Sequence, residues 1–251
     1  SSFYKDKKGN IILGTFGEGL IVVTNLELTE INLPDPSLKI TRVTSSNDKT
    51  IYLGTQNGKI YKIDSTQKVS LFRDEKFRNI EVLEYFQETN SLLINNHIPT
   101  FINVSTKKES SRELGAIKDV VRLDYNNYLI ASNIGVYRFN PLNEAKYKKV
   151  SPSQYITNFL GRTICVAYDS ISNIVFAGTS LGLKIGNEIK ADFFTLDDKT
   201  IICRDILFYD GRTYVSTKND GILIFENDQL ITKWTKDKLQ SNTISHIKEY
   251  N

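Results

Sequence analysis

A sixfold internal repeat constrains the fold of this 251-residue chain more than any other feature. Each unit contains an apolar run, a small residue, then Thr, Ser or Asn, a polar turn that usually carries glycine, and a second apolar run. The small residues serve as anchors, and they are Gly14, Gly54, Asn95, Ala131, Gly178 and Ser216. The intervals between them are 40, 41, 36, 47 and 38 residues. That period predicts an all-β fold, a β-propeller with four-stranded antiparallel blades.

The strands of each unit can be placed from the anchors, and we name them A, the innermost, to D, the outermost. Hairpin signals, such as Asn126-Asn127 and Asp210-Gly211, separate the A and B strands. B strands are almost continuously apolar, as expected where neighbouring blades cover both faces of a sheet. The small anchors then mark close approach between blades, so a bulky residue at Gly54 or Gly178 is predicted to destabilise the domain.

The number of blades follows from the two ends of the repeat. Residues 1–5 supply an A strand, and a further A strand begins at Ile244. We therefore expect residues 1–251 to form a single propeller segment, with six repeat units plus the first strand of a seventh. The segment then belongs to a seven-bladed propeller in a longer, multi-domain protein. A closed six-bladed ring with a spare terminal strand is the alternative.

Charge and hydropathy narrow the classes of partner. The net charge is +3, and the basic residues are scattered, so no stripe suited to nucleic acid is present. No apolar run approaches the roughly 20 residues of a membrane span. We expect contact with a membrane only through regions outside this segment.

Few residues suggest chemistry. The glycines from Gly14 to Gly19 superficially resemble a phosphate-binding loop, but the sequence that follows reads as a strand rather than a helix, which favours a turn. Cys165 and Cys203 each lie 13 residues before an anchor, so we expect equivalent A-strand positions and two buried free thiols. His97 and His246 have no recognisable catalytic partners. We predict no catalytic residue, no metal site and no cofactor.

Ligands of propellers usually bind the face formed by the B–C turns and D–A connections. Residues 151–159 are expected to form the longest D–A connection, and the atypical B–C turn at His97 reflects either specificity or drift in a degenerate repeat. Aromatic and amide side chains on this face would suit a sugar. The candidate ligand-binding residues are Phe16, Gln56, Asn57, His97, Asn133, Tyr155, Lys218, Asn219 and Asp220.

The sequence motif of the repeat resembles that of a known family. Residues 6–20 and 239–247 are similar to the two-component regulator propeller repeat, approximately "L-x-S/N-N-x-I/V-x-x-I" followed by "D-x-x-G-N-I/L-W-I-G-T-x-x-G-L". The resemblance extends in degraded form over all six units. It departs from the pattern where Ile12, Tyr52, Tyr128, Phe176 or Tyr214 replaces the usual Trp, and where the third unit loses both glycines.

The resemblance implies a periplasmic sensor region of a hybrid histidine kinase/response regulator. Such a region recognises a small glycan or similar ligand and signals to a kinase outside this segment, and a homodimer of the intact receptor is expected. One alternative is a non-enzymatic protein-interaction propeller, a scaffold or assembly factor, because residues 51–64 also resemble quinoprotein-type repeats. A propeller enzyme would need a carboxylate or histidine constellation that the sequence does not assemble.

Overall fold

The computed structural model describes residues 2–5, 11–14, 20–23, 31, 33–35, 37–76, 78–95, 98–111, 115–142 and 154–247. The chain divides into two compact units, Ser1–Pro36 and Ser37–Asn251. The regular elements of the described residues are all β-strands. None of these residues belongs to a helix long and apolar enough to cross a membrane.

The first unit contains an antiparallel three-stranded sheet in the order β1-β2-β3, which we call blade 1. Its strands are β1 (Ser2–Lys5), β2 (Ile11–Gly14) and β3 (Leu20–Val23). The register pairs Ser2 with Gly14, and Gly14 with Leu20. These strands match the A, B and C strands expected from the first repeat.

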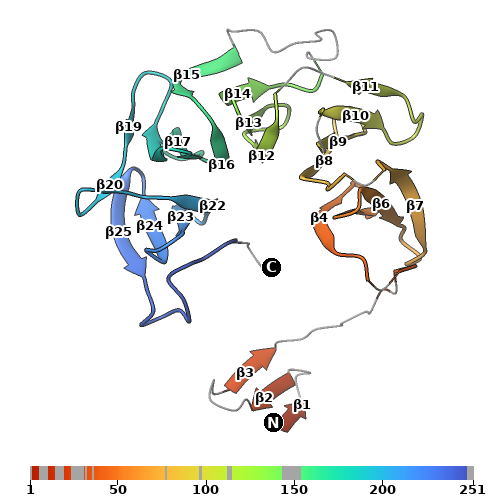
Figure 1. Ribbon diagram of the computed structural model, residues 1–251, viewed down its shortest axis with the longest axis horizontal. Helices are drawn as coiled ribbons and strands as arrows, with labels where there is room; N and C mark the ends of the chain where they lie inside the picture. The colour runs from red at the N-terminus through yellow and green to blue at the C-terminus, as the bar shows by residue number, and fades with distance from the viewer. Residues whose placement is uncertain are drawn as a thin grey trace. The chain divides into compact units, whose positions relative to one another are not determined.

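The second unit contains five four-stranded antiparallel sheets within its described residues, and Figure 1 shows them following one another along the chain. Blade 2 comprises β4 (Ile40–Ser45), β5 (Ile51–Thr55), β6 (Lys59–Ile63) and β7 (Val69–Asp74). Blade 3 comprises β8 (Val82–Phe86), β9 (Ser91–Asn95), β10 (Thr100–Asn103) and β11 (Glu109–Ser111). Blade 4 comprises β12 (Ile117–Arg122), β13 (Tyr128–Ser132), β14 (Gly135–Phe139) and β15 (Tyr155–Leu160).

Blades 5 and 6 complete this series. Blade 5 comprises β16 (Thr163–Asp169), β17 (Ile174–Thr179), β18 (Gly182–Gly186) and β19 (Ala191–Phe193). A two-stranded hairpin follows, with β20 (Thr195–Leu196) and β21 (Lys199–Thr200). Blade 6 comprises β22 (Cys203–Tyr209), β23 (Arg212–Thr217), β24 (Ile222–Glu226) and β25 (Gln229–Trp234). The A strands of consecutive blades contact one another from β4 to β22, so these strands form the inner wall.

The core lies between neighbouring blades. Phe176 of blade 5 meets Phe225 of blade 6 with ring centroids 5.4 Å apart, and Phe86 of blade 3 meets Phe139 of blade 4 at 5.6 Å. All five residues of β9 and all five of β13 are buried. Burial on both faces explains why the B strands read as continuous apolar runs rather than alternating ones.

The anchors lie where one blade approaches the next. A Cβ atom at Gly54 would come within 2.7 Å of Cγ2 of Ile80, at the entrance to blade 3. The side-chain nitrogen of Asn95 donates a hydrogen bond of 2.9 Å to the carbonyl oxygen of Ile117 in blade 4. The predicted role of the anchors in close approach between blades is confirmed at these positions.

In four of the described blades the Thr or Ser after the anchor holds the B–C turn. The hydroxyl groups donate to main-chain carbonyl oxygens across the turn at distances of 2.7 to 3.0 Å. The four donor–acceptor pairs are Thr55–Lys59, Ser132–Gly135, Thr179–Gly182 and Thr217–Gly221. This hydrogen bond across the turn explains why Thr or Ser follows the anchor in the repeat motif.

The two cysteines do not occupy equivalent positions, and that expectation is wrong. Cys165 pairs with its anchor Gly178, whereas Cys203 pairs with Thr217, the residue after its anchor. The A–B turn of blade 5 spans residues 170–173, whereas that of blade 6 spans only 210–211. Residues at the same sequence distance before their anchors therefore lie two positions apart along the A strand. Both cysteines are nevertheless buried and free, as predicted.

Residues 242–247 follow the path of an A strand beside blade 6. The amide of Ile244 donates to the carbonyl oxygen of Thr217 at 3.0 Å, as the amide of Ile80 does to that of Thr55 at 3.2 Å. The amide of Ile247 donates to Oδ2 of Asp205 at 3.1 Å. These bonds fit the strand expected from Ile244 onward, whose last residues lie outside the described chain. The blade number of the intact ring stays a prediction.

Candidate interaction surface

Two of the amides proposed to bind a ligand are engaged in their own turns. Oδ1 of Asn57 lies 2.7 Å from the hydroxyl of Thr55, whose single proton it shares with the carbonyl oxygen of Lys59. Oδ1 of Asn133 accepts a hydrogen bond of 2.8 Å from the amide of Ala116. Amide oxygens used in this way stabilise the turns, and they are not free to bind the hydroxyl groups of a sugar.

The other predicted residues fall into two groups. Gln56, Lys218 and Asn219 are exposed on B–C turns, and Asp220 is partly buried with its amide donating 2.7 Å to the hydroxyl of Thr217. Phe16 and His97 lie outside the described residues. The residues on the B–C turns are accessible, but their side chains do not converge on one point, so they do not identify a ligand.

Tyr155 does not lie in a D–A connection, so that placement is wrong. It begins the outer strand β15 and pairs with Tyr137, with the two ring centroids 5.3 Å apart. The long insertion of this repeat therefore precedes the D strand rather than following it. Gly135 pairs with Leu160 at the other end of β15, so Leu160 is the residue that reaches the predicted face.

Exposed aliphatic side chains mark that face instead. The position three residues after the anchor is Ile98 in blade 3, Ile134 in blade 4 and Leu181 in blade 5. These side chains are 53%, 46% and 71% exposed. Leu160 and Ile202, on the adjoining D–A connections, are 54% and 47% exposed. We call these five residues the B–C face.

Hydrogen bonds between main-chain groups join the parts of this face from blade 4 to blade 6. The amide of Gly161, next to Leu160, donates to the carbonyl oxygen of Ile134 at 2.7 Å. The amide of Ser180, next to Leu181, donates to the carbonyl oxygen of Arg162 at 2.9 Å. The amide of Lys218 donates to the carbonyl oxygen of Ile202 at 3.0 Å. The aliphatic tips are thus fixed on one connected framework, as an interaction surface requires.

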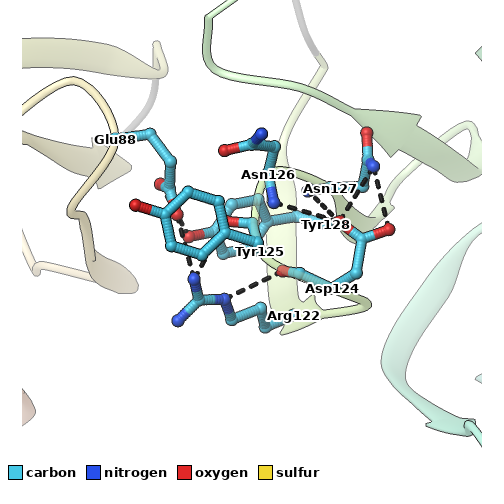
Figure 2. Close-up of polar contacts among 7 residues, drawn as sticks. All are labelled: Glu88, Arg122, Asp124, Tyr125, Asn126, Asn127 and Tyr128. Carbon is cyan, nitrogen blue, oxygen red and sulfur yellow. Dashed lines mark hydrogen bonds and ion pairs between the residues drawn. The ribbon is translucent and has the colours of Figure 1, made fainter.

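The opposite end of the blades carries a polar cluster that joins blades 3 and 4 (Figure 2). The side chain of Glu88 is only 1% exposed, and its carboxylate accepts bonds from Nη2 of Arg122 at 3.1 Å and the hydroxyl of Tyr128 at 3.0 Å. Arg122 also donates to the carbonyl oxygens of Asp124 and Tyr125. Burial, reinforced by Glu88, raises the pKa of the Tyr128 hydroxyl. This cluster is a structural cross-link in which Arg122 and Tyr128 satisfy the buried carboxylate of Glu88.

The inner wall encloses a hollow of about 480 Å³ lined by residues of several A strands. Its carboxylates hold the backbone: Oδ2 of Asp119 accepts from the amide of Val166 at 2.9 Å, and Asp205 binds the amide of Ile247. Within the described ranges, no three His, Cys, Asp or Glu side chains are grouped to hold a metal ion. Burial raises the pKa of the Cys203 thiol to about 12, and burial beside Cys203 raises the pKa of Cys165, so neither is an activated nucleophile.

Comparisons with known proteins support the fold. No family model matches the chain, and no curated protein sequence matches it. A streptogramin B lyase structure is similar over 86% of this chain and 75% of its own, with a TM-score of 0.55 and 12% sequence identity. A structure of the mitotic checkpoint complex is similar over 86% of this chain and 67% of its own chain, with a TM-score of 0.54 and 12% identity. At such identity the likeness shows the fold alone: this chain has an all-β, β-propeller fold.

Proposed function

We propose that this chain is a non-enzymatic interaction propeller whose protein partner binds the B–C face. The observation that carries the proposal is the run of exposed aliphatic side chains at equivalent turns of blades 3, 4 and 5. Covering the exposed half to two-thirds of one such side chain is worth roughly 0.7–2 kcal/mol, scaled from about 1.5–3 kcal/mol for full burial. Several of them on a rigid framework are the kind of apolar centre around which protein interfaces form.

Recognition of a glycan has less support from the geometry of this face. Asn57 and Asn133 spend their side-chain oxygens within the protein, and Tyr155 packs against Tyr137. A sugar site needs polar groups that converge on one ligand. The periplasmic glycan sensor and its kinase partner stay predictions from the family resemblance.

The proposal can be tested by selecting peptides from a displayed random library against the whole chain. Binders are then measured against Leu181→Asp and against Ile171→Asp, a matched control in the same blade. Ile171 is 75% exposed but lies on an A–B turn at the opposite end. We expect Leu181→Asp to weaken binding by about tenfold or more, because a carboxylate would replace an aliphatic side chain that the bound peptide covers. Ile171→Asp should change it less than about twofold.

Two results would contradict the proposal. One is a selection that yields no binder. The other is a set of binders that lose affinity with Ile171→Asp and keep it with Leu181→Asp.

A further inference from the structure

We infer that the partner presents an acidic, aliphatic segment to the B–C face. This inference rests on the function proposed above and adds the charge of the partner. It comes from the cations that border the exposed aliphatic side chains, Arg162, Arg204 and Lys218. All three are exposed, and none takes part in an ion pair with another described residue.

Each cation lies beside an aliphatic residue of the face. The main chain of Arg162 is bonded to Ser180, the neighbour of Leu181, and that of Lys218 to Ile202. Arg204 is the bulged residue of β22, two positions after Ile202. A peptide that covers the aliphatic tips would therefore pass these positive charges.

Acidic groups of the protein cancel only part of this charge. The carboxylate of Asp205, the neighbour of Arg204, accepts the amides of Ile206 and Ile247 and lies 3.5 Å from Nδ1 of His246. Asp220 shares a turn with Lys218 and is the one acid on the described B–C turns. The D–A connection that carries Ile202 also contains Asp197, Asp198 and Lys199, all exposed. Four cations against three carboxylates leave the face with a small positive excess.

The opposite end of the blades is arranged differently. Arg122 pairs with Glu88 at 3.1 Å, and Arg138 pairs with Glu188 at 2.6 Å. These two arginines serve the protein itself, whereas no ion pair among the described residues engages Arg162, Arg204 or Lys218. Complementary charge selects among partners and speeds their encounter, and it repels partners of the same sign.

The test uses the peptides selected on the whole chain. We expect the enriched sequences to contain more Asp and Glu than the starting library, together with Leu, Ile or Val. Fluorescence anisotropy of the tightest labelled peptide then compares the wild type with the double variant Arg162→Glu/Lys218→Glu. A matched control, Lys68→Glu/Arg212→Glu, makes the same change in net charge on exposed residues at the opposite end of the blades.

The double variant at the face should weaken binding by about tenfold, because two attractive pairs become repulsive, while the control should change it less than about twofold. Added salt should weaken wild-type binding and have a smaller effect on the double variant. Binders without an acidic excess that ignore Arg162→Glu/Lys218→Glu but lose affinity with Leu181→Asp would overturn this inference and leave the proposed function standing. A selection without binders would overturn both.

Discussion

Replacing Gly178 by alanine tests how blades 5 and 6 pack. The added Cβ atom would lie 2.5 Å from Sγ of Cys165 and 2.7 Å from Cβ of Cys203. Both cysteines are buried and belong to strands of two adjacent blades, so neither can withdraw without moving a sheet. Overpacking of this kind costs about 1–3 kcal/mol. For a chain of this size, that corresponds to a fall in Tm of about 2–12 °C.

A double-mutant cycle identifies the cause of that loss. Cys165→Ala removes the sulfur that is closest to the new methyl group. Gly178→Ala should therefore be less damaging in the Cys165→Ala background, by about 1 kcal/mol. Urea unfolding can be followed through the fluorescence of Trp234, which is the single tryptophan and lies in blade 6. Gly178→Ala with wild-type stability, or with an equal cost in both backgrounds, would refute the reasoning.

Three further predictions concern the turn motif, the cross-link and the thiols. Thr217→Val should lower the free energy of unfolding by about 1–2 kcal/mol, because the Gly221 carbonyl loses its hydroxyl donor, and urea unfolding measures this. Arg122→Ala should cost about 1–3 kcal/mol, because it leaves the buried carboxylate of Glu88 without its cation, also measured by urea unfolding. The folded state raises the pKa of both thiols, so it is favoured below the ordinary thiol pKa of 9.0 and loses that advantage as pH rises toward about 12. At pH 10 the loss is about 1.4 kcal/mol per thiol, measured as the change in unfolding free energy relative to Cys165→Ala/Cys203→Ala.

Each of these predictions has a control. Thr235→Val changes a partly exposed threonine after β25 whose hydroxyl bonds only the exposed Asp237 carboxylate, so it should cost less than Thr217→Val, and an equal loss would deny the turn bond its role. Arg138→Ala breaks an exposed ion pair and should cost less than Arg122→Ala. A constant stability difference between wild type and the double cysteine variant from pH 7 to pH 10 would contradict the argument from the thiol pKa values.

Much of the fold can be predicted from the sequence because the repeat has a local physical cause. Small anchors permit close approach between blades, and the following hydroxyl closes the B–C turn. Both requirements recur in blades 2, 4, 5 and 6, so they leave a period that is visible without a structure. The period also places the B strands, whose burial on both faces makes them continuously apolar.

The details that the sequence leaves open depend on register and on side-chain partners. Counting from anchors assumes equal hairpins, and the longer A–B turn of blade 5 shifts Cys165 relative to Cys203. Tyr155 looks like a loop residue because the preceding insertion has loop composition, although it starts an outer strand. Asn57 looks available for a ligand until the structure shows its side-chain oxygen beside the hydroxyl of Thr55.

The B–C face has a sequence signal, an aliphatic residue three positions after the anchor, that amino-acid composition does not reveal. Reading the third position after each anchor would have given Ile98, Ile134 and Leu181 in three consecutive blades, between Asn57 and Asn219. An isoleucine in a turn is unremarkable alone, and only the alignment of repeats shows the recurrence. Its exposure depends on the folded turns, which is why the structure was needed to separate a surface from a core.

Hydrogen–deuterium exchange on the complex with a selected peptide tests the binding face most directly. We expect slower amide exchange on binding in residues 133–135, 180–182 and 200–204, which carry Ile134, Leu181, Ile202 and Arg204. We expect unchanged exchange in the A–B turns at residues 124–127, 170–173 and 210–211. Protection confined to those A–B turns, with none on the B–C face, would contradict the central claim.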